Sequence, residues 1–314
     1  MKNYIDLSDI SDLEKLISES LKLKAENSAA ETGKGKTLGM LFFNPSLRTR
    51  LSTEKAARLL GMEVMVMNAD KDGWALEFED GAIMDSTKAE HIKEAAAVLS
   101  QYCDVIAVRA FPGLIDKHKD ESEQVMNSFR KYASVPVINL ESATGHPLQA
   151  LTDAITITEL NKKSKPKVVL TWAPHPKALP QSVANSFVSM MKKMNVDLVI
   201  ANPDGYDLNP EITGETPVMN DQKKALENAD FVYVKNWSSY DQYGKILYTK
   251  ESWTLNNEKL KQTNNAKVMH CLPVRRNVVI ADEVLDGENS VVIQEAGNRT
   301  YAAQAVLKAL LENK

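Results

Sequence analysis

Short apolar runs alternate along the chain with longer segments in which apolar residues recur at every third or fourth position. A short apolar run is typical of a buried strand, and the wider spacing is typical of an amphipathic helix. The runs predict strands at Thr37–Phe43, Val64–Met67, Val105–Arg109, Val135–Asn139, Val168–Trp172, Asp197–Ala201, Phe231–Lys235, Lys267–Met269 and Val291–Ile293. The wider spacing predicts helices at Glu90–Gln101, Val125–Tyr132, Leu148–Leu160, Gln181–Met194, Asp221–Glu227 and Thr300–Leu311.

This alternation of strands with helices indicates an α/β fold in which parallel sheets are covered by helices. The strands fall into two similar groups on either side of residues 141–160, and a polar, lysine-rich connection, residues 161–167, leads into the second group. We therefore expect two domains, residues 1–147 and 148–314, each with a parallel sheet flanked by helices. The terminal helix, about residues 300–311, can pack back on the first domain.

The composition is that of an ordinary globular protein of 314 residues, with 43% hydrophobic and 25% charged residues. The formal net charge of −4 argues against a nucleic-acid partner, because nucleic-acid binding usually requires a basic surplus. The two cysteines argue against a disulfide framework. The polar N-terminus has no signal-peptide core, and no apolar run reaches the roughly 18 residues that a membrane span needs. These features predict a cytoplasmic protein with no membrane partner.

The first predicted strand leads into a turn with the sequence N-P-S-L-R-T-R, residues 44–50, and a helical pattern follows. Ligands of open parallel sheets bind beyond the carboxyl ends of the strands, where a helix N-terminus offers N–H donors and a positive dipole end. Ser46 and Thr49 add hydroxyl groups, and Arg48 adds a guanidinium that matches phosphate oxygens. The turn predicts an anion site, although an ordinary helix start with surface ion pairs is an equal alternative. Neither glycine-rich phosphate motif is present.

Other strand and helix ends carry polar groups of the same kind. They are, in chain order, Arg109, His146 with Gln149, Cys271 and Arg299. Arg109 ends a predicted strand, Pro147 favours a helix start just after His146, and Arg299 comes just before the predicted terminal helix. Each of these residues, taken singly, is more often structural than functional. Coincidence explains any one of them easily and all of them together poorly.

Three motifs occur in this order: S-x-R-T-R at residues 46–50, H-P-x-Q at 146–149 and H-C-L-P at 270–273. Through them the chain resembles the carbamoyl-phosphate-dependent transcarbamylases over nearly its whole length. The resemblance implies one domain for carbamoyl phosphate, one for an amino-acid substrate, and a homotrimer with active sites between subunits. The residues that it implies for carbamoyl phosphate are Ser46, Leu47, Arg48, Thr49, Arg109, His146, Gln149, Cys271, Arg299 and, from a neighbouring subunit, Trp74. The alternative for Trp74 is a partly buried loop residue.

The implied reaction is the attack of an uncharged δ-amine on the carbamoyl carbon. Negative charge then develops on the carbonyl oxygen and on the departing phosphate. Thr49, Arg109 and His146 are the candidate catalytic residues, because their donors can stabilise that oxygen. No cofactor is required and no metal is expected, since His270 and Cys271 are adjacent rather than spaced as a zinc pair.

The predicted acceptor site departs from that of the ornithine enzymes. Those enzymes carry an acidic residue in a D-x-W-A-S-M-G segment that meets the free α-ammonium group, whereas this chain has Lys235 and Asn236 at the comparable strand end, with no S-M-G. A lysine would repel an ammonium group, so the chain resembles the N-acetyl- and N-succinylornithine transcarbamylases of arginine synthesis. The proline-rich segment Thr171–Ser182 matches the segment where the chain of that subgroup is knotted, and it predicts a knot in the second domain. The residues implied for the acylated substrate are Glu141, His175, Lys235, Leu272, Arg275 and Ala89.

The acyl group is predicted to be succinyl. The acetyl-type enzymes resemble one another in having a glutamate at the position of Ala89, and the succinyl-type enzymes have proline there. Ala89 is neither of these residues, but like proline it is small and uncharged. A glutamate over the pocket would repel the second carboxylate of a succinyl group, while alanine leaves the space open. The neighbouring Glu90 could take the glutamate's place if the helix start shifted by one residue. Arg50 and Arg276 are expected to be structural ion-pair partners.

Three alternatives to acylornithine carbamoylation remain. Lys235 argues against carbamoylation of free ornithine. The missing glycine-rich turn argues against a nicotinamide dehydrogenase. The joint presence of Arg48, Arg109, His146, Gln149 and Arg299 argues against a non-catalytic anion sensor.

Overall fold

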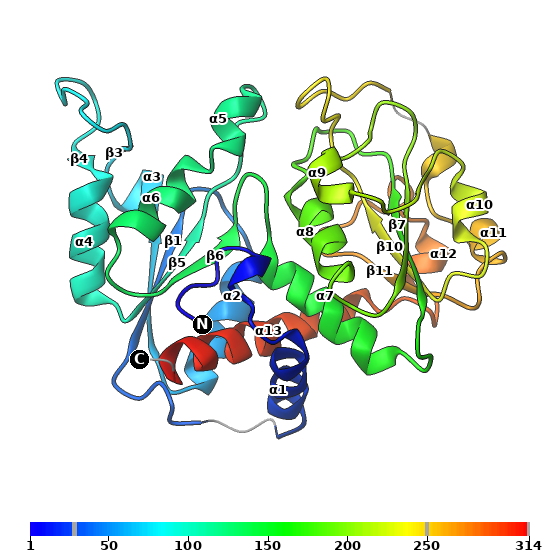
Figure 1. Ribbon diagram of the computed structural model, residues 1–314, viewed down its shortest axis with the longest axis horizontal. Coiled ribbons are helices and arrows are strands. Elements are labelled where there is room, and N and C mark those ends of the chain that lie inside the picture. The colour runs from blue at the N-terminus through cyan, green and yellow to red at the C-terminus, as the bar shows by residue number, and fades with distance from the viewer. Residues whose placement is uncertain (27–29, 249–250, 313–314) are drawn as a thin grey trace. The chain divides into compact units, whose positions relative to one another are not determined.

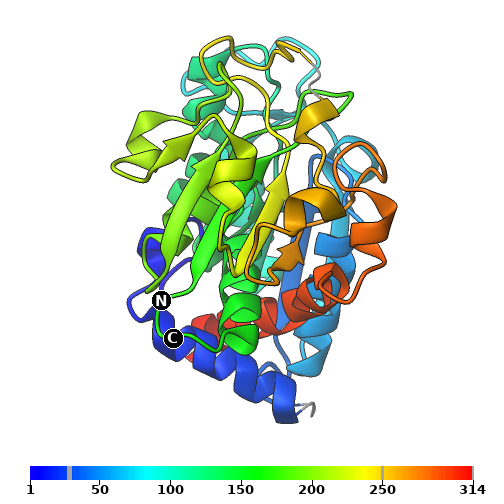
Figure 2. The same cartoon turned by 90° about the vertical axis from the view of Figure 1, so that its right-hand side faces the viewer.

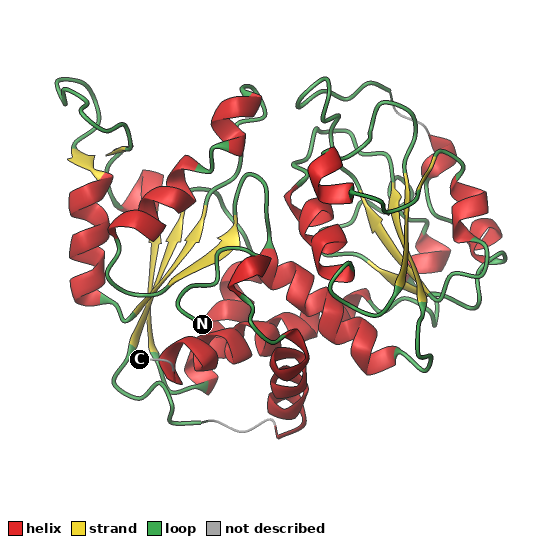
Figure 3. Ribbon diagram, viewed as in Figure 1, coloured by secondary structure: helices red, strands yellow, loops and turns green. Residues whose placement is uncertain are grey.

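The structure, a computed structural model of the chain, describes residues 1–26, 30–248 and 251–312. The chain forms two compact units (Figure 1): unit 1 contains residues 1–113, 118–148 and 299–314, and unit 2 contains residues 114–117 and 149–298. Each unit is built on a parallel sheet with helices around it (Figure 3). The predicted two-domain α/β fold with helix-flanked parallel sheets is therefore confirmed. Within the described ranges, no helix combines the length and the apolar character that crossing a bilayer requires.

The sheet of unit 1 has the strand order β2–β1–β5–β6, and all neighbouring strands are parallel. Its strands are β1 (Thr37–Phe42), β2 (Glu63–Asn68), β5 (Val105–Arg109) and β6 (Val137–Glu141). Every residue of β5 and β6 is buried, as expected for strands covered on both faces. The register between these two strands shifts at their ends, so that Val108 pairs with Asn139 but Arg109 pairs with Glu141. The shift brings the Glu141 carboxylate beside the Arg109 guanidinium.

Helices surround this sheet. They are η1 (Leu7–Asp9), α1 (Leu13–Glu26), α2 (Arg48–Leu59), α3 (Ala69–Asp72), α4 (Ile92–Tyr102), α5 (Lys117–Glu121) and α6 (Gln124–Tyr132). Helices α4 and α6 pack on each other, and beneath them lies a core that includes Ile92, Ile106, Val108 and Phe129. A short two-stranded parallel sheet, β3 (Leu76–Glu77) with β4 (Glu90–His91), precedes α4.

The sheet of unit 2 has the order β11–β10–β7–β8–β9 and is also parallel, with its strands side by side in Figure 2. Its strands are β7 (Lys167–Trp172), β8 (Asp197–Ala201), β9 (Val218–Met219), β10 (Phe231–Lys235) and β11 (Lys267–Met269). Its helices are α8 (Ser182–Met191), α9 (Pro210–Thr213), α10 (Gln222–Leu226), η2 (Glu251–Trp253), α11 (Asn257–Leu260) and α12 (Asp282–Leu285). Aromatic side chains build much of its core. The ring of Trp172 lies 4.6 Å from that of Tyr206, and the ring of Phe187 lies 4.3 Å from that of Tyr233.

The long helices α7 (Pro147–Leu160) and α13 (Val292–Glu312) contribute residues to both units, and so does the short helix α5 through Lys117. Pro147 takes the first position of α7, as predicted from its fixed φ angle and its missing N–H. In unit 1, the end of α13 is tied to α1 by an ion pair of 3.1 Å between Lys308 and Glu19.

Several predicted elements need correction. The strand at Val291–Ile293 is wrong, because α13 begins at Val292 and Ser290 makes only an isolated bridge with Val268 of β11. Arg299 consequently lies inside the terminal helix rather than before it. Strand β6 begins at Val137 instead of Val135, since Pro136 has no N–H to donate to a ladder. The helix predicted from Glu90 begins at Ile92, after the short strand β4.

Candidate active site

The turn between β1 and α2 presents the start of a helix without a side-chain cap. Leu47 occupies the N-cap position, makes no capping hydrogen bond and is 66% exposed, and the first turn of α2 contains no acidic residue. The first backbone N–H groups of a helix have no partner within the helix, and the helix dipole is positive there. Together with Ser46, Arg48 and Thr49, this turn has the composition of an anion site.

Arg109 holds this turn in place from the end of β5. Its Nη1 atom donates to the backbone oxygens of Asn44 at 3.3 Å and Pro45 at 2.9 Å. Its Nη2 atom donates to Glu141 Oε2 at 3.0 Å, and both side chains are buried. The buried Nε atom of Arg109 has no hydrogen-bond partner among the described residues. The Nε–H group of Arg109 can therefore donate to a ligand, while the two Nη atoms are held in place by the protein.

His146 and Arg299 complete the cluster in unit 1. His146 Nε2 lies 3.8 Å from Glu141 Oε2, so one carboxylate contacts both Arg109 and His146. Arg299 Nη2 donates to Thr49 Oγ1 at 2.7 Å, and both residues are buried. Unit 1 thus links Arg109 to the predicted phosphate turn, Arg299 to Thr49 of that turn, and Glu141 to both Arg109 and His146. This excess of positive charge suits an anionic ligand.

Gln149 belongs to a buried cluster of unit 2. Its amide nitrogen donates to Asp153 and Glu295, and the second oxygen of Glu295 accepts from the backbone N–H of His270. Sequence reasoning missed both acids. Asp153 follows Gln149 by one helical turn, which was a usable signal, whereas Glu295 was hidden because the terminal helix was predicted to begin at residue 300.

The turn after β11 carries Cys271 and Leu272. Cys271 is a half-buried cysteine in the thiol form. Leu272 has a φ angle of 54°, in the left-handed region that branched residues rarely adopt, and its N–H donates to His270 Nδ1 at 2.8 Å. Burial, together with the charges of Asp153, Cys271 and Glu295, raises the pKa of Tyr233 well above its ordinary value. Tyr233 is therefore a neutral neighbour of this turn.

A second cluster in unit 2 contains Lys235, His175 and Arg275. Lys235 ends β10, is only 8% exposed, and makes no ion pair within residues 1–26, 30–248 and 251–312. Arg275 Nε donates to His175 Nε2 at 3.2 Å. Burial lowers the pKa of His175 from 6.5, and the charges of Lys235 and Arg275 lower it further. The cluster offers two cations and a neutral imidazole to a ligand.

Trp74 and Ala89 lie at the base of an arm, residues 73–91, that contains β3 and β4. Trp74 is 59% exposed, and its Nε1 atom donates to Glu90 Oε2 at 2.8 Å. Ala89 is exposed, and its N–H donates to Ala75 at 3.2 Å. Glu90 is the residue that could take the position of the acetyl-type glutamate if the helix start shifted. Its carboxylate accepts the hydrogen bond from Trp74.

Two carboxylates order this arm. Hydrogen bonds from the N–H of Glu79 and from Lys88 lower the pKa of Glu77 to about 2. Asp80 contacts Lys93 at 2.7 Å and accepts from the hydroxyl of Tyr132 at 2.9 Å. The arm is therefore fastened to the helices α4 and α6 of its own chain.

Arg50 and Arg276 make the ion pairs predicted for them. Arg50 contacts Glu54 at 2.9 Å, and Arg276 contacts Asp282 at 2.9 Å and Asp286 at 2.7 Å. Neither arginine contacts a predicted site residue through these bonds.

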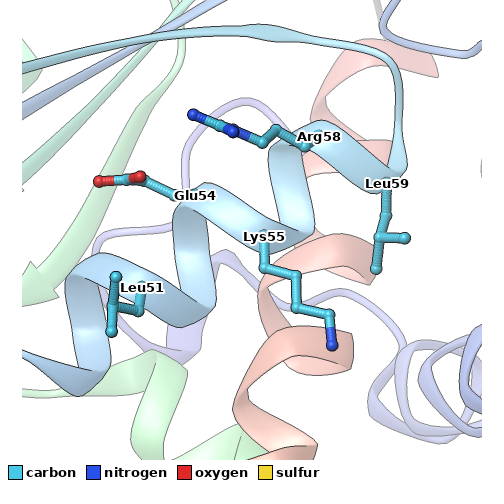
Figure 4. Close-up of a pocket in the computed structure, with 5 residues that line it drawn as sticks. All are labelled: Leu51, Glu54, Lys55, Arg58 and Leu59. Atoms are coloured by element: carbon cyan, nitrogen blue, oxygen red, sulfur yellow. The ribbon is translucent and has the colours of Figure 1, made fainter.

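A hollow of about 320 Å³ lies beside α2, on one exposed face of the helix (Figure 4). Its lining residues are Leu51, Glu54, Lys55, Arg58 and Leu59. None of them was predicted to bind a ligand, and Arg48 and Thr49 precede all of them at the start of the helix.

Known protein families match both halves of the chain. Residues 2–159 match the carbamoyl-phosphate-binding domain of aspartate/ornithine carbamoyltransferases, and residues 180–310 match the Asp/Orn-binding domain. The N-succinylornithine carbamoyltransferase of Bacteroides fragilis is 48% identical over 100% of this chain and 99% of its own. The N-acetylornithine carbamoyltransferase of Xanthomonas campestris is 37% identical over 99% of this chain and 98% of its own.

Solved structures give the same result. A Glu-to-Ala mutant of N-acetyl-L-ornithine transcarbamylase, bound to carbamyl phosphate and N-succinyl-L-norvaline, matches with a TM-score of 0.93 at 37% identity and covers 99% of this chain and 100% of its own. Acetylornithine transcarbamylase bound to acetylcitrulline matches with a TM-score of 0.93 at 36% identity, over 99% of each chain. The resemblance carried by the three sequence motifs is thus confirmed, and the chain belongs to the aspartate/ornithine carbamoyltransferase family.

Proposed function

We propose that this carbamoyltransferase transfers the carbamoyl group of carbamoyl phosphate to the δ-amine of N-succinyl-L-ornithine, giving N-succinyl-L-citrulline and phosphate in arginine biosynthesis. The observation that carries the proposal is the full-length identity of 48% to two N-succinylornithine carbamoyltransferases of Bacteroides, against 37% to the N-acetylornithine enzymes. The residue at position 89 and the charge of the acceptor cluster support the same choice of substrate.

The turn at the start of α2 is proposed to hold the phosphate group. Ser46, Leu47, Arg48 and Thr49 supply backbone, hydroxyl and guanidinium donors that match phosphate oxygens. As the carbamoyl carbon becomes tetrahedral, the charge on its oxygen is stabilised by Thr49, Arg109 and His146. The buried Nε atom of Arg109, which has no partner among the described residues, supports this role. Gln149, Cys271, Arg299 and the Trp74 of a neighbouring subunit are the further proposed contacts.

Catalysis in this scheme depends on position and charge. The protein holds the amine and the carbamoyl carbon together, which removes much of the entropy cost of their meeting. The departing phosphate takes up the proton that the amine loses, so no side-chain base is required. Glu141 is proposed to contact the acylornithine, and its bond to Arg109 gives it the second task of orienting that guanidinium.

Lys235, His175 and Arg275 are proposed to bind the acidic part of the acceptor, with Leu272 beside them. A buried lysine without an ion-pair partner in the described ranges favours a carboxylate ligand, because a charge buried alone is costly. An acylated α-nitrogen carries no charge and is tolerated there, whereas the ammonium group of free ornithine would be repelled.

The succinyl choice rests on Ala89. Solved mutants of N-acetyl-L-ornithine transcarbamylase in which one glutamate is replaced by alanine, proline, valine or serine were obtained with N-succinyl-L-norvaline. These ligands support the view that removing a glutamate makes room for a succinyl group. The exposed alanine at position 89 of this chain leaves the same room.

The Lys235→Met variant is expected to lose about 10- to 150-fold in kcat/KM for N-succinylornithine, because a hydrogen bond to a charged group contributes about 1.5–3 kcal/mol. Its melting temperature is expected to stay equal or rise, since methionine fills the same buried space without a charge. Steady-state kinetics and thermal unfolding give both quantities. Lys177→Met is the matched control, because Lys177 is exposed in the same loop as His175. An unchanged kcat/KM in Lys235→Met, or an equal loss in the control, contradicts the assignment.

A homotrimer is proposed in which the arm of one chain reaches the active site of the next. The arm exposes large apolar side chains, since Ile83 is 84% exposed and Trp74 is 59% exposed, and such side chains are commonly covered in an assembly.

Mixing Trp74→Ala chains with Arg48→Ala chains, each with little activity alone, is expected to raise the activity through hybrid trimers. Each hybrid ring has one site with both native residues, so recovery is at most about one third of the wild-type activity. Activity is measured after subunit exchange has been verified by mass. If exchanged trimers stay inactive, the shared site is wrong.

The main test is carbamoyl-phosphate-dependent phosphate release, measured separately with ornithine, N-acetylornithine and N-succinylornithine. We expect the highest kcat/KM with N-succinylornithine. A preference for N-acetylornithine overturns only the assignment of a succinyl group to the acceptor. A preference for free ornithine overturns the proposed role of Lys235 in binding an acylated acceptor. Anion binding without turnover would favour the sensor alternative, and binding of a nicotinamide would favour the dehydrogenase. A knot in unit 2 and a cytoplasmic location stay predictions.

A further inference from the structure

The loop between β6 and α7 connects two of the proposed site residues. Glu141 ends β6 and His146 comes directly before α7, so only residues 142–145 separate them along the chain. His146 Nε2 lies 3.8 Å from Glu141 Oε2. All of these residues belong to unit 1. The course of this four-residue loop therefore determines whether the imidazole and the carboxylate stay together.

A carboxylate from another part of unit 1 clamps this loop. Glu123 Oε1 accepts hydrogen bonds from Ser142 Oγ at 2.7 Å, from the backbone N–H of Thr144 at 2.6 Å and from Thr144 Oγ1 at 2.5 Å. Such bonds are stronger when the acceptor is an ionised carboxylate than when it is a neutral oxygen. One oxygen atom of Glu123 thus holds two of the four loop residues.

The hydroxyl of Ser142 passes this constraint on to Gly145. Its Oγ atom accepts from Asn139 Nδ2 at 2.9 Å and from the backbone N–H of Gly145 at 3.3 Å. A hydroxyl has one proton to donate. The nearer acceptor is the Glu123 carboxylate, at 2.7 Å, while the oxygen of Gly145 lies at 3.2 Å. Glu123 therefore orients the hydroxyl that fixes Gly145, the residue next to His146.

Glu123 serves this loop rather than its own helix. It occupies the N-cap position of α6, but its side chain makes no capping hydrogen bond to the described residues of that helix. Side chains at this position commonly cap the helix. The backbone of Glu123 has a φ angle of 49°, in the left-handed region that residues other than glycine seldom adopt. A strained residue of this kind indicates a use outside its own element, and the contacts with Ser142 and Thr144 display that use.

We propose that Glu123 is a positioning residue that holds residues 142–145 so that His146 stays beside Glu141. This inference rests on the proposed function, in which His146 stabilises the charge that develops on the carbonyl oxygen. Glu123 acts through the loop and does not touch the reacting atoms. A displacement of about 1 Å in a catalytic group can lower a rate about 100-fold. Loss of the clamp should therefore slow the turnover of bound carbamoyl phosphate.

The first test compares turnover with anion binding in Glu123→Ala and Glu123→Gln of the full-length chain. We expect kcat for carbamoyl transfer to fall about 10- to 100-fold in Glu123→Ala. Glutamine keeps the length and one acceptor oxygen of the side chain, so Glu123→Gln should recover part of the loss. The affinity for inorganic phosphate, measured by calorimetry, should stay unchanged, because the proposed phosphate turn is a different segment, residues 46–49.

The second test observes the position of the imidazole directly and requires no activity. The chain has five histidines, so nuclear magnetic resonance of ring-labelled histidine gives a small set of signals. The signal of His146 is assigned by its loss in His146→Asn. In Glu123→Ala this signal should move, whereas the signals of His175 and His270, which belong to unit 2, should stay in place.

Two further variants separate the clamp from a general effect of charge. Glu121→Ala is the matched control, since Glu121 ends α5 two residues earlier and, within the described ranges, has no bond to residues 142–145. It should keep the wild-type kcat and the wild-type signal of His146. On the Glu123→Ala background, Thr144→Val should lower kcat no further, because the hydroxyl acts through the missing carboxylate.

The outcomes are distinct. An unchanged kcat or an unchanged signal of His146 in folded Glu123→Ala overturns the positioning role. Equal effects in Glu121→Ala overturn it as well, and so does failure of both Glu123 variants to fold, since the carboxylate would then serve stability. A wild-type chain that transfers no carbamoyl group overturns the proposed function instead, and the signal of His146 still tests the clamp.

Discussion

Arg48→Ala chains are expected to bind carbamoyl phosphate about 10- to 150-fold more weakly than the wild type and to lose most of their transferase activity. The guanidinium stands at the uncapped start of α2, where it is proposed to bond to phosphate oxygens. A charge-assisted hydrogen bond contributes about 1.5–3 kcal/mol, which corresponds to this range of affinity. Calorimetry with carbamoyl phosphate measures the loss. The fold is expected to survive, because Arg48 is half-buried and alanine favours a helix.

Arg50→Ala is the matched control for this prediction. It removes the same guanidinium two residues later, and Arg50 is already paired with Glu54 on the exposed side of α2. Exposed i,i+4 pairs of this kind contribute only about 0.3–0.5 kcal/mol. The control should therefore bind carbamoyl phosphate like the wild type. Equal affinities in both variants would rule out Arg48 as a phosphate contact.

The Ala89→Glu variant is expected to move the acceptor preference from N-succinylornithine toward N-acetylornithine by about 100-fold. The new carboxylate would stand over the pocket and face the second carboxylate of the succinyl group, and like charges in contact cost several kcal/mol. The acetyl substrate ends in a methyl group and avoids this cost. The ratio of kcat/KM for the two acceptors measures the shift. The fold should persist, because Ala89 is exposed.

Thr87→Glu controls for added charge on the arm. Thr87 is exposed and lies two residues before Ala89. Thr87→Glu therefore has the same net charge as Ala89→Glu, but its new carboxylate lies at a different position on the arm. Its acceptor ratio should match that of the wild type. If both variants shift the ratio equally, the arm acts through its overall charge. If neither does, Ala89 does not face the acceptor.

Most of the sheet scaffold was predictable, because strands buried on both faces leave continuous apolar runs such as Val105–Arg109 and Phe231–Lys235. Element ends were less predictable, since they depend on partners distant in sequence. Val291–Ile293 has the composition of a strand, but α13 begins at Val292. The preceding residue, Ser290, pairs with Val268 of β11 through a single isolated bridge, which is too little pairing to form a strand. The arm strands β3 and β4 have two residues each and pair across a loop, so the sequence shows almost no apolar pattern that would predict them.

The candidate site was predictable where a residue follows a strand or starts a helix, as Ser46, Arg109 and His146 do. The orientation of these groups was not. The one-residue register shift that pairs Arg109 with Glu141 depends on two strands far apart in the sequence. Buried acids are also hard to predict, because Glu295 and Asp153 look in sequence like the solvated charges of any helix. Their burial follows only from the packing around Gln149.

The discontinuity of unit 1 has a consequence for the synthesis of the chain. The unit includes residues 299–314, and these residues supply the hydrogen bond from Arg299 to Thr49 and the ion pair from Lys308 to Glu19. A ribosome makes these residues after those of unit 2, so part of the surface of the N-terminal segment stays uncovered until unit 2 has been made. Synthesis of residues 299–314, rather than completion of residues 1–148, then becomes the step that allows unit 1 to close. A premature stop codon just before residue 299 would therefore damage unit 1, most of which was translated first.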